Sequence, residues 1–305
     1  MSLKYFLVDV FAEERYTGNQ LAVIIGNPPT PLMQRLALEM NLSETTFVTS
    51  TQPENSGYNV RIFTKQRELP FAGHPTLGTA YILQREILRL PAKQVNLNLG
   101  VGQIPVTFDQ DDLLWMQQKP VQFGHIHDPD EIAQILNLRF EDIDPHYPIQ
   151  DASTGNPHII VPVKTLDALK RVDVDVPRFR SYLLDIDSMP GANAFCVFTP
   201  ETYFTHNDFN VRTFGHLRSV PEDPATGSAI GNLAGYLAHH EYFGTSSLYK
   251  LRVEQGYEIN RPSLLLFSVE RQHNQLPHEI RNTPERGLVI SVGGKVRLVA
   301  RGELV

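Results

Sequence analysis

Two short stretches, H-P-T-L-G-T-A at 74–80 and D-P-A-T-G-S-A at 223–229, decide the fold because they are diverged copies of one pattern. Each places a polar residue before proline and continues with glycine, a hydroxyl residue and alanine. A second pair precedes them in the same order, N-V-R-I-F at 59–63 and N-V-R-T-F at 210–214. The two offsets, 149 and 151 residues, are nearly equal. The sequence therefore predicts an internal duplication.

A third match and the chain length extend this prediction to the whole protein. Gly18-Asn19 and Gly155-Asn156 lie 137 residues apart and open the two halves. A chain of 305 residues exceeds one ordinary hydrophobic core and fits two domains of about 150 residues each. We predict an N-terminal half over 1–120 and a C-terminal half over 121–287, with the strand-like residues 288–305 returning to the first half.

Hydrophobic periodicity predicts an α/β composition in both halves. Leu32, Leu36 and Met40 repeat every four residues after Thr30-Pro31, which predicts an amphipathic helix capped by Thr30. Further helices are predicted over Pro75–Leu83, Pro224–His239 and from Asp128-Pro129 onward. The predicted strands are Phe6–Val10, Leu21–Ile25, Thr45–Thr49, Val60–Thr64, Val95–Leu99, Ile104–Phe108, His158–Val163, Ala194–Phe198, Val211–Phe214 and Leu264–Phe267.

The starts of the two central helices carry the residues best suited to chemistry. His74 and Asp223 are predicted at the N-cap positions, each followed by a proline whose missing N–H costs nothing in a first turn. Small residues follow, so a ligand could approach the backbone N–H groups at the positive end of the helix dipole. Such a helix start binds carboxylate or phosphate and can stabilise an enolate. Since domain interfaces favour small-molecule clefts, we expect the two starts to face each other across one cleft.

The alternative is that His74 and Asp223 only cap their helices. Asp223→Ala would then cost about 1 kcal/mol of stability and leave ligand binding unchanged.

Bulk composition and missing motifs exclude several classes of protein. The net charge of −7 argues against a nucleic-acid partner. Asp9 interrupts the first apolar run before a signal peptide could form, and no apolar stretch reaches membrane-spanning length, so we expect a cytoplasmic protein without membrane association. The single cysteine, Cys196, lies in an apolar run that predicts a buried thiol. The histidines show no metal-ligand spacing, and Gly100-Val101-Gly102 predicts a hairpin and no nucleotide site.

Four longer segments resemble the PhzF family of phenazine biosynthesis-like isomerases. They are L-S-E-T-T-F-V at 42–48, R-E-L-P-F-A-G-H-P-T-L-G-T-A at 67–80, E-D-P-A-T-G-S-A at 222–229 and V-E-Q-G-Y-E-I-N-R-P-S at 253–263. The resemblance implies a diaminopimelate epimerase-like fold with two pseudo-symmetric halves. Each half would be a curved, mostly antiparallel sheet around a central helix. It implies no cofactor and no metal, and it favours a homodimer, which no sequence feature demonstrates.

The resemblance also implies roles for particular residues. Glu44 would be the principal acid/base, and His74 and Asp223 would assist with proton handling. Gly73, Gly227 and Ser228 would donate to a substrate carboxylate, and Asn19 and Asn156 would line the cleft. The related epimerases place a cysteine at each helix start, where this chain has His74 and Asp223. This difference argues against a two-thiol racemase.

Glu44 by itself reads as a solvated carboxylate ahead of a strand, and only the resemblance makes it a base. A base that removes a carbon-bound proton should be mostly buried, because burial brings a carboxyl group toward the required basicity. We therefore expect an isomerase that moves a proton within a small carboxylate-bearing metabolite. The alternatives are an epimerase or racemase, and a binding protein that has lost turnover.

Overall fold

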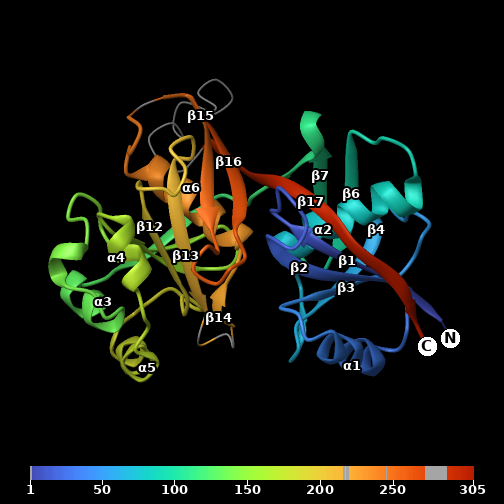
Figure 1. Ribbon diagram of the computed structural model, residues 1–305, viewed down its shortest axis with the longest axis horizontal. Helices are drawn as coiled ribbons and strands as arrows, with labels where there is room; N and C mark the ends of the chain where they lie inside the picture. Colours follow the sequence, from blue (N-terminus) through green and yellow to red (C-terminus); the bar gives the residue numbers. More distant parts are fainter. Residues whose placement is uncertain (1, 216, 218–219, 245, 272–286) are drawn as a thin grey trace. The chain divides into compact units, whose positions relative to one another are not determined.

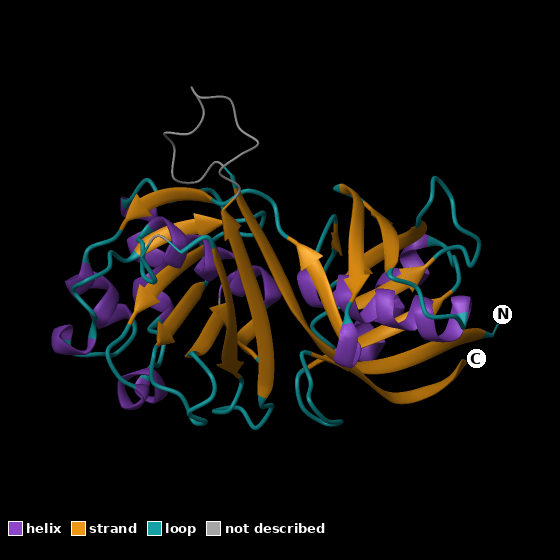
Figure 2. Ribbon diagram, turned by 90° about the horizontal axis from the view of Figure 1, so that it is seen from above, coloured by secondary structure: helices purple, strands orange, loops and turns teal. Residues whose placement is uncertain are grey.

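The computed structural model describes residues 2–215, 217, 220–244, 246–271 and 287–305. The chain divides into two compact units (Figure 1). Unit 1 comprises Met1–Gln117 and Gly293–Val305, and unit 2 comprises Gln118–Val292. Strands and helices alternate through both units (Figure 2), so the predicted α/β class is confirmed.

Unit 1 is a mixed, mostly antiparallel sheet around the central helix α2 (Gly73–Ile82). Adjacent strands pair antiparallel except for β2 with β3 and β4 with β6, which are parallel. The helix α2 contacts β1, β2, β3, β6, β7 and β8. The strands are β1 (Leu3–Val10), β2 (Asn19–Ile25), β3 (Thr45–Val48), β4 (Tyr58–Phe63), β5 (Glu68–Leu69), β6 (Gln94–Leu99), β7 (Gly102–Phe108) and β8 (Leu113–Gln117).

The last strand, β17 (Leu288–Leu304), begins in unit 2 and continues into unit 1. There it pairs antiparallel with β1, from Val10 opposite Val296 to Leu3 opposite Leu304. Figure 1 shows β17 running beside β1 toward the C-terminus. The N-terminal strand is thus paired on both sides, by β2 and by β17.

Unit 2 repeats this arrangement around α6 (Gly227–His239). Its parallel pairs are β11 with β12 and β13 with β15, and the other adjacent strands pair antiparallel. The strands are β9 (Gln122–Ile126), β10 (Gln150–Ser153), β11 (His158–Pro162), β12 (Phe195–Thr199), β13 (Phe209–Gly215), β14 (Val220–Asp223), β15 (Leu248–Gln255) and β16 (Ser263–Arg271).

The succession of strand pairings is the same in both units. It runs antiparallel, parallel, antiparallel, antiparallel to a short strand, parallel past the central helix, and antiparallel again. The predicted repeats fall on equivalent elements, since N-V-R-I-F lies in β4 and N-V-R-T-F in β13. This correspondence between the two units supports the predicted duplication.

Outside the sheets the two units differ. In unit 1 the helix α1 (Thr30–Met40) packs Met33 and Ala37 against Ile24, Phe47 and Phe63. In unit 2 a larger apolar cluster joins β11 and β12 to three helices, α3 (Pro129–Ile135), α4 (Leu166–Arg171) and α5 (Val176–Asp185). Shorter helical segments are Leu83–Leu88, Gln110–Asp112 and Phe140–Asp142.

The start of α1 corrects one prediction. Pro29, rather than Thr30, is the N-cap residue, and it makes no side-chain capping hydrogen bond. The Thr30 hydroxyl instead accepts a hydrogen bond of 2.9 Å from Arg61 of β4. The Thr30 hydroxyl therefore makes a tertiary contact in place of the capping hydrogen bond that the local sequence pattern predicts.

Candidate functional site

Glu44 and His74 meet within unit 1. Glu44 immediately precedes β3, and His74 is the second residue of α2. Nε2 of His74 lies 3.5 Å from Oε2 of Glu44, and the two side chains are 7% and 17% exposed. The structure therefore brings a mostly buried carboxyl group against a buried imidazole.

His74 is neutral in this setting. Burial penalises the charged ring and lowers the pKa of His74 to about 3, and a backbone hydrogen bond at Gln20 offsets only part of that effect. The contact with Glu44 therefore joins a carboxyl group to a neutral imidazole and is not an ion pair. A neutral imidazole beside a carboxyl group can accept or donate a proton at that position.

Neighbouring polar residues hold this pair in place. Asn19, at the start of β2 and buried, lies with Nδ2 3.4 Å from Nδ1 of His74. Thr46 of β3 and Thr79 of α2 share a buried hydrogen bond of 2.8 Å. The strand that follows Glu44 is thereby tied to the helix that carries His74.

The predicted N-cap role of His74 is wrong. The helix α2 begins at Gly73, and its N-cap residue Ala72 makes no side-chain capping hydrogen bond. Pro75 lies within the first turn, where its missing N–H breaks no helical hydrogen bond. The His74 side chain is thus available to contact Glu44, and Gly73 stands at the first helical position.

The depressed pKa of His74 predicts a pH dependence of stability. The unfolded residue titrates near 6.5 and the folded one near 3, so the unfolded state binds the extra proton between these values. Stability from this residue is therefore present above pH 6.5 and is lost as the pH falls toward 3, by up to about 1.4 kcal/mol per pH unit. Urea unfolding from pH 7 to 4 should show a shallower loss in His74→Asn than in the wild type. Equal slopes would contradict a buried neutral His74.

Asp223 belongs to unit 2 and forms a cluster with other residues there. It ends β14, where it pairs with Thr213 of β13. Its Oδ2 accepts a short hydrogen bond of 2.5 Å from the hydroxyl of Thr226. Sequence reasoning singled out Asp223 but not Thr226, whose role depends on this tertiary arrangement.

The predicted helix over Pro224–His239 begins later than expected, and Asp223 is not its N-cap. The helix α6 starts at Gly227 with Thr226 at the N-cap. Asp223 stays in the sheet because β14 pairs it across to β13. Gly227 and Ser228 therefore lie in the first turn, and the side chain of Thr226 makes no capping hydrogen bond to it.

Asn156 and Ser228 also lie together in unit 2. Nδ2 of Asn156 is 3.5 Å from the Ser228 hydroxyl oxygen. The Asn156 carbonyl accepts a hydrogen bond of 2.9 Å from Nδ2 of Asn232, a fully buried residue of α6. Oδ1 of Asn232 accepts a second hydrogen bond of 2.6 Å from the backbone N–H of Thr154. Asn232, which sequence reasoning missed, thus anchors the 154–156 turn to the central helix.

Gly256, beside the start of α6, gives a direct test of how closely the chain packs against Pro224. Gly256 has φ +81°, and an added Cβ would lie 2.6 Å from the Pro224 carbonyl oxygen and close to that of Arg261. Gly256→Ala should therefore cost about 3 kcal/mol in urea unfolding, from left-handed strain plus a backbone clash. Gly244, at φ +67° with no atom within 4 Å of its Cβ position, is the control and should cost about 1 kcal/mol. Similar costs would contradict the close approach at Pro224.

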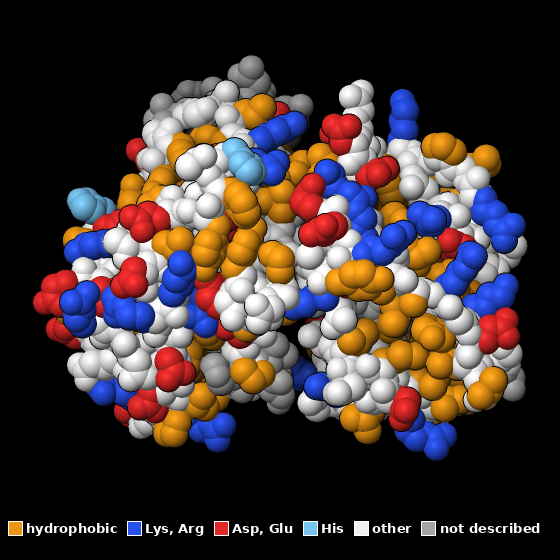
Figure 3. All heavy atoms as spheres, viewed as in Figure 1, with side chains coloured by type: hydrophobic (Ala, Val, Ile, Leu, Met, Phe, Trp, Pro, Cys, Tyr) orange, Lys and Arg blue, Asp and Glu red, His pale blue; other side chains and the backbone are white. Residues whose placement is uncertain are grey.

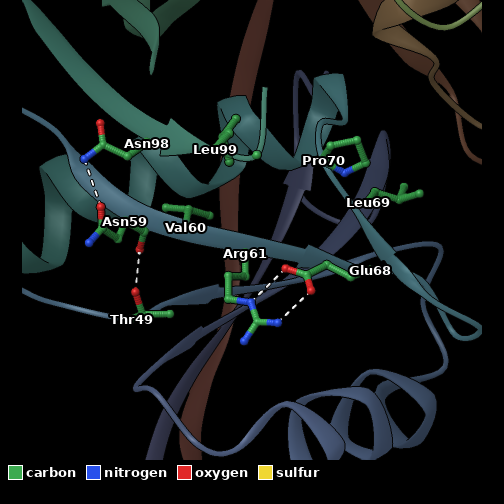
Figure 4. A pocket seen from close by; sticks show the side chains of 10 residues that line it. Thr49, Asn59, Val60, Arg61, Glu68, Leu69, Pro70, Asn98 and Leu99 are labelled. Carbon is green, nitrogen blue, oxygen red and sulfur yellow. Dashed lines mark hydrogen bonds and ion pairs between the residues drawn. The ribbon is translucent and has the colours of Figure 1, made fainter. Parts of the chain in front are cut away.

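A separate surface pocket of about 640 Å³ lies in unit 1 around the outward residues of β4. Figure 4 shows Arg61 extended toward Glu68, with Asn59 and Asn98 linked beside it. The guanidinium is already paired by bonds of 2.7 and 2.6 Å to Glu68, and the lining includes neither Glu44 nor His74. This pocket is therefore distinct from the candidate site.

One other cluster has a closed, structural geometry. The buried His127 Nε2 lies 2.8 Å from Asp151, whose second oxygen accepts from Ser188 and from the Met189 backbone. The predicted burial of Cys196 is confirmed, and burial raises the pKa of its thiol. Across the described residues, no group of three or more His, Cys, Asp or Glu side chains could hold a metal ion.

Two compact units, each with a mixed sheet around a buried helix, define the fold class shared by amino-acid epimerases and related isomerases. A hydroxyproline epimerase from Agrobacterium vitis has this fold, with a TM-score of 0.61 over 99% of this chain and 92% of its own at 10% identity. That level of identity shows the fold alone. The predicted epimerase-like fold is thereby confirmed.

The family follows from closer matches. The chain belongs to the phenazine biosynthesis-like protein family, whose model matches residues 8–283. A PhzF-family protein from Bacillus anthracis has a TM-score of 0.87 at 27% identity, covering 100% of this chain and 99% of that one. The predicted family is confirmed.

Curated relatives give the class of activity. An uncharacterized isomerase of Clostridium acetobutylicum is 29% identical over 100% of this chain and 99% of its own. The trans-2,3-dihydro-3-hydroxyanthranilate isomerase of Pseudomonas aeruginosa is 32% identical over 88% of this chain and 90% of its own. The protein is therefore an isomerase.

Proposed function

We propose that this protein moves a proton within a small carboxylate-bearing metabolite by acid/base catalysis, without a cofactor. Glu44 removes a proton from carbon and returns it at another carbon. His74 and Asp223 relay protons and hydrogen-bond to the substrate.

The observation that carries the proposal is the buried pair of Glu44 and His74. Both side chains are largely shielded from water, and Nε2 of His74 lies 3.5 Å from Oε2 of Glu44. A carboxyl group held close to a second proton-transferring side chain can act as a general acid/base toward a carbon-bound proton. Burial lowers the pKa of His74 and keeps its ring neutral, so it can take or give a proton beside Glu44.

The starts of α2 and α6 support a carboxylate-bearing substrate. Gly73 and Gly227 are the first residues of these helices, and the N-cap residues Ala72 and Thr226 make no side-chain capping hydrogen bond. Backbone N–H groups at a helix start, together with Ser228, would hold a carboxylate and stabilise negative charge in the transition state. The name of the Pseudomonas aeruginosa relative gives the first compound to test, trans-2,3-dihydro-3-hydroxyanthranilate.

An epimerase that returns the proton to the same carbon is the second candidate, and the epimerase-like fold favours it. The site chemistry speaks against a two-thiol form of it, because the single Cys196 is buried in β12. Inversion at the carbon that exchanges its proton would identify an epimerase, and product formation by proton relocation would identify the proposed isomerase.

The test is turnover by protein dialysed against a metal chelator and supplied with no cofactor. A panel of small carboxylates is first screened by thermal shift, with trans-2,3-dihydro-3-hydroxyanthranilate included, and the compounds that bind are followed by NMR. Isomerised product at an undiminished rate after dialysis supports the proposal. Binding without turnover would favour a protein that keeps the site but has lost catalysis.

The environment of this enzyme also follows as a set of proposals. Within the described residues, no helix is long and apolar enough to cross a membrane. Lys and Arg side chains are interspersed with Asp and Glu on the face in Figure 3, a pattern that does not favour nucleic acid. We propose a cytoplasmic protein whose partner is a small molecule. A homodimer stays a prediction that light scattering would check.

A further inference from the structure

We propose that Gln255 is a positioning residue that orients the Asp223 carboxylate through the hydroxyl of Thr226. The inference rests on the proposed function, in which Asp223 takes part in proton transfer. It assigns a role to the glutamine of V-E-Q-G-Y-E-I-N-R-P-S, the one family segment whose chemistry the site does not otherwise use.

The side-chain amide of Gln255 makes three hydrogen bonds to the loop that leads into α6. Gln255 is the last residue of β15 and is fully buried. Its Oε1 accepts from the Thr226 backbone N–H at 3.0 Å. Its Nε2 donates to the Asp223 carbonyl at 2.7 Å and to the Thr226 hydroxyl oxygen at 3.1 Å.

The backbone partners fix which way this amide points. The Thr226 N–H can only donate and the Asp223 carbonyl can only accept, so Oε1 and Nε2 of Gln255 cannot exchange places. A hydroxyl has one proton to donate. Since Gln255 donates to the Thr226 oxygen, the Thr226 proton is directed to Oδ2 of Asp223, 2.5 Å away.

Thr226 is held away from the role that its position suggests. It occupies the N-cap of α6, where a threonine hydroxyl ordinarily accepts from the first turn, but it makes no such bond. Thr165, at the N-cap of α4 in the same unit, does cap its helix by accepting from Ala168 at 3.1 Å. The Thr226 hydroxyl therefore donates to Asp223 and does not cap the helix.

The strand behind Gln255 makes the arrangement stiff. Gln255 is paired with Ser263 of β16 on one side and with Val211 of β13 on the other. The next residue, Gly256, packs so closely against the Pro224 carbonyl that no side chain fits. The loop that carries Asp223 is thus seated on the sheet and cannot shift without breaking these contacts.

The kinetic test compares Thr226→Val with Thr226→Ser on the carboxylate that the wild type isomerises. The valine variant keeps the branched shape but loses the hydroxyl, and its kcat should fall about 10- to 100-fold with KM changed by less than about 3-fold. The serine variant should recover most of the turnover. An unchanged kcat in the valine variant would overturn the proposal.

Two further variants separate positioning from structural support. Thr165→Val removes an ordinary cap in the same unit, so it should lower the melting temperature while kcat measured well below that temperature stays constant. Gln255→Glu keeps the acceptor for Thr226 N–H but removes both donors, so its kcat should also fall. If Thr226 and Gln255 act through one relay, the double variant Thr226→Val/Gln255→Glu should lose less kcat than the product of the two single-variant losses. A fully multiplicative loss would overturn the relay.

A spectroscopic arm decides the inference even if no carboxylate is turned over. In protein labelled with ¹³C at aspartate carboxyl groups, the Asp223 resonance is assigned by its absence in Asp223→Asn. That resonance should move in Thr226→Val and Gln255→Glu and stay in place in Thr165→Val. A wild type without turnover would contradict the proposed function alone, whereas an unmoved resonance would contradict the role of Gln255.

Discussion

Replacing Glu44 with glutamine is expected to lower kcat about 10³-fold, because the amide can neither accept nor return the substrate proton. The change is nearly isosteric, so the packing of the 17%-exposed side chain should persist. The amide has nearly the same shape, so the 3.5 Å approach to His74 should be kept. Binding should therefore change little, and the loss should appear in kcat rather than in KM.

The matched control for this variant is Glu39→Gln. Glu39 lies on α1 of the same unit with an exposed side chain, so it loses the same charge without touching the site. It should retain wild-type turnover within about 2-fold. If Glu44→Gln keeps more than a tenth of the wild-type kcat, Glu44 is not the principal base.

Arg212→Met is expected to cost about 3–5 kcal/mol in the free energy of unfolding, because it breaks a buried ion pair. Arg212 and Glu222 are 9% and 11% exposed, and their bidentate contact has bonds of 2.9 and 2.7 Å. The same guanidinium donates to the carbonyls of Leu169, Lys170 and Val172 near the end of α4. Removing it leaves a carboxylate and three carbonyls without this donor.

The equivalent ion pair in unit 1 supplies the control for Arg212→Met. Arg61 and Glu68 make the equivalent bidentate pair in unit 1, but their side chains are 31% and 40% exposed. Arg61→Met should therefore cost only about 1 kcal/mol or less. Urea unfolding at pH 7 measures both, with separate transitions fitted if the units unfold independently. Equal costs would show that burial does not set the strength of these pairs.

The arginine of N-V-R-x-F shows what local sequence can and cannot reveal. The repeated motif predicted equivalent strands, and it lies in β4 and β13. The ion pairs of the two arginines could not be predicted, because their partners Glu68 and Glu222 lie in the short strands β5 and β14. Those strands are too short to carry a periodic pattern.

The helix starts show a similar limit. The proline pattern predicted that Asp223 would open a helix, but pairing to Thr213 keeps it in β14. At His74 the same pattern placed the residue one position before the helix, although α2 begins at Gly73. Capping preferences are local, and a partner distant in sequence can outweigh about 1 kcal/mol of capping energy.

Glu44 was named only through the family resemblance, Gln255 was not singled out at all, and the sequence alone explains neither position. Residue type and position alone made Glu44 a solvated carboxylate, and its contact with His74 joins residues 30 positions apart. Gln255 reaches Thr226 across 29 positions. Such contacts depend on how β3 and β15 pack beside the central helices, which periodicity does not encode.

The most direct test of the account is proton exchange in heavy water. Wild-type protein and Glu44→Gln are incubated in deuterium oxide with the carboxylate that the wild type isomerises, beginning with trans-2,3-dihydro-3-hydroxyanthranilate, and substrate and product are followed by proton NMR. The account predicts that the wild type loses one substrate C–H signal as product forms, and that Glu44→Gln leaves this signal intact. Loss of the signal at the same rate in Glu44→Gln would contradict the central role of Glu44.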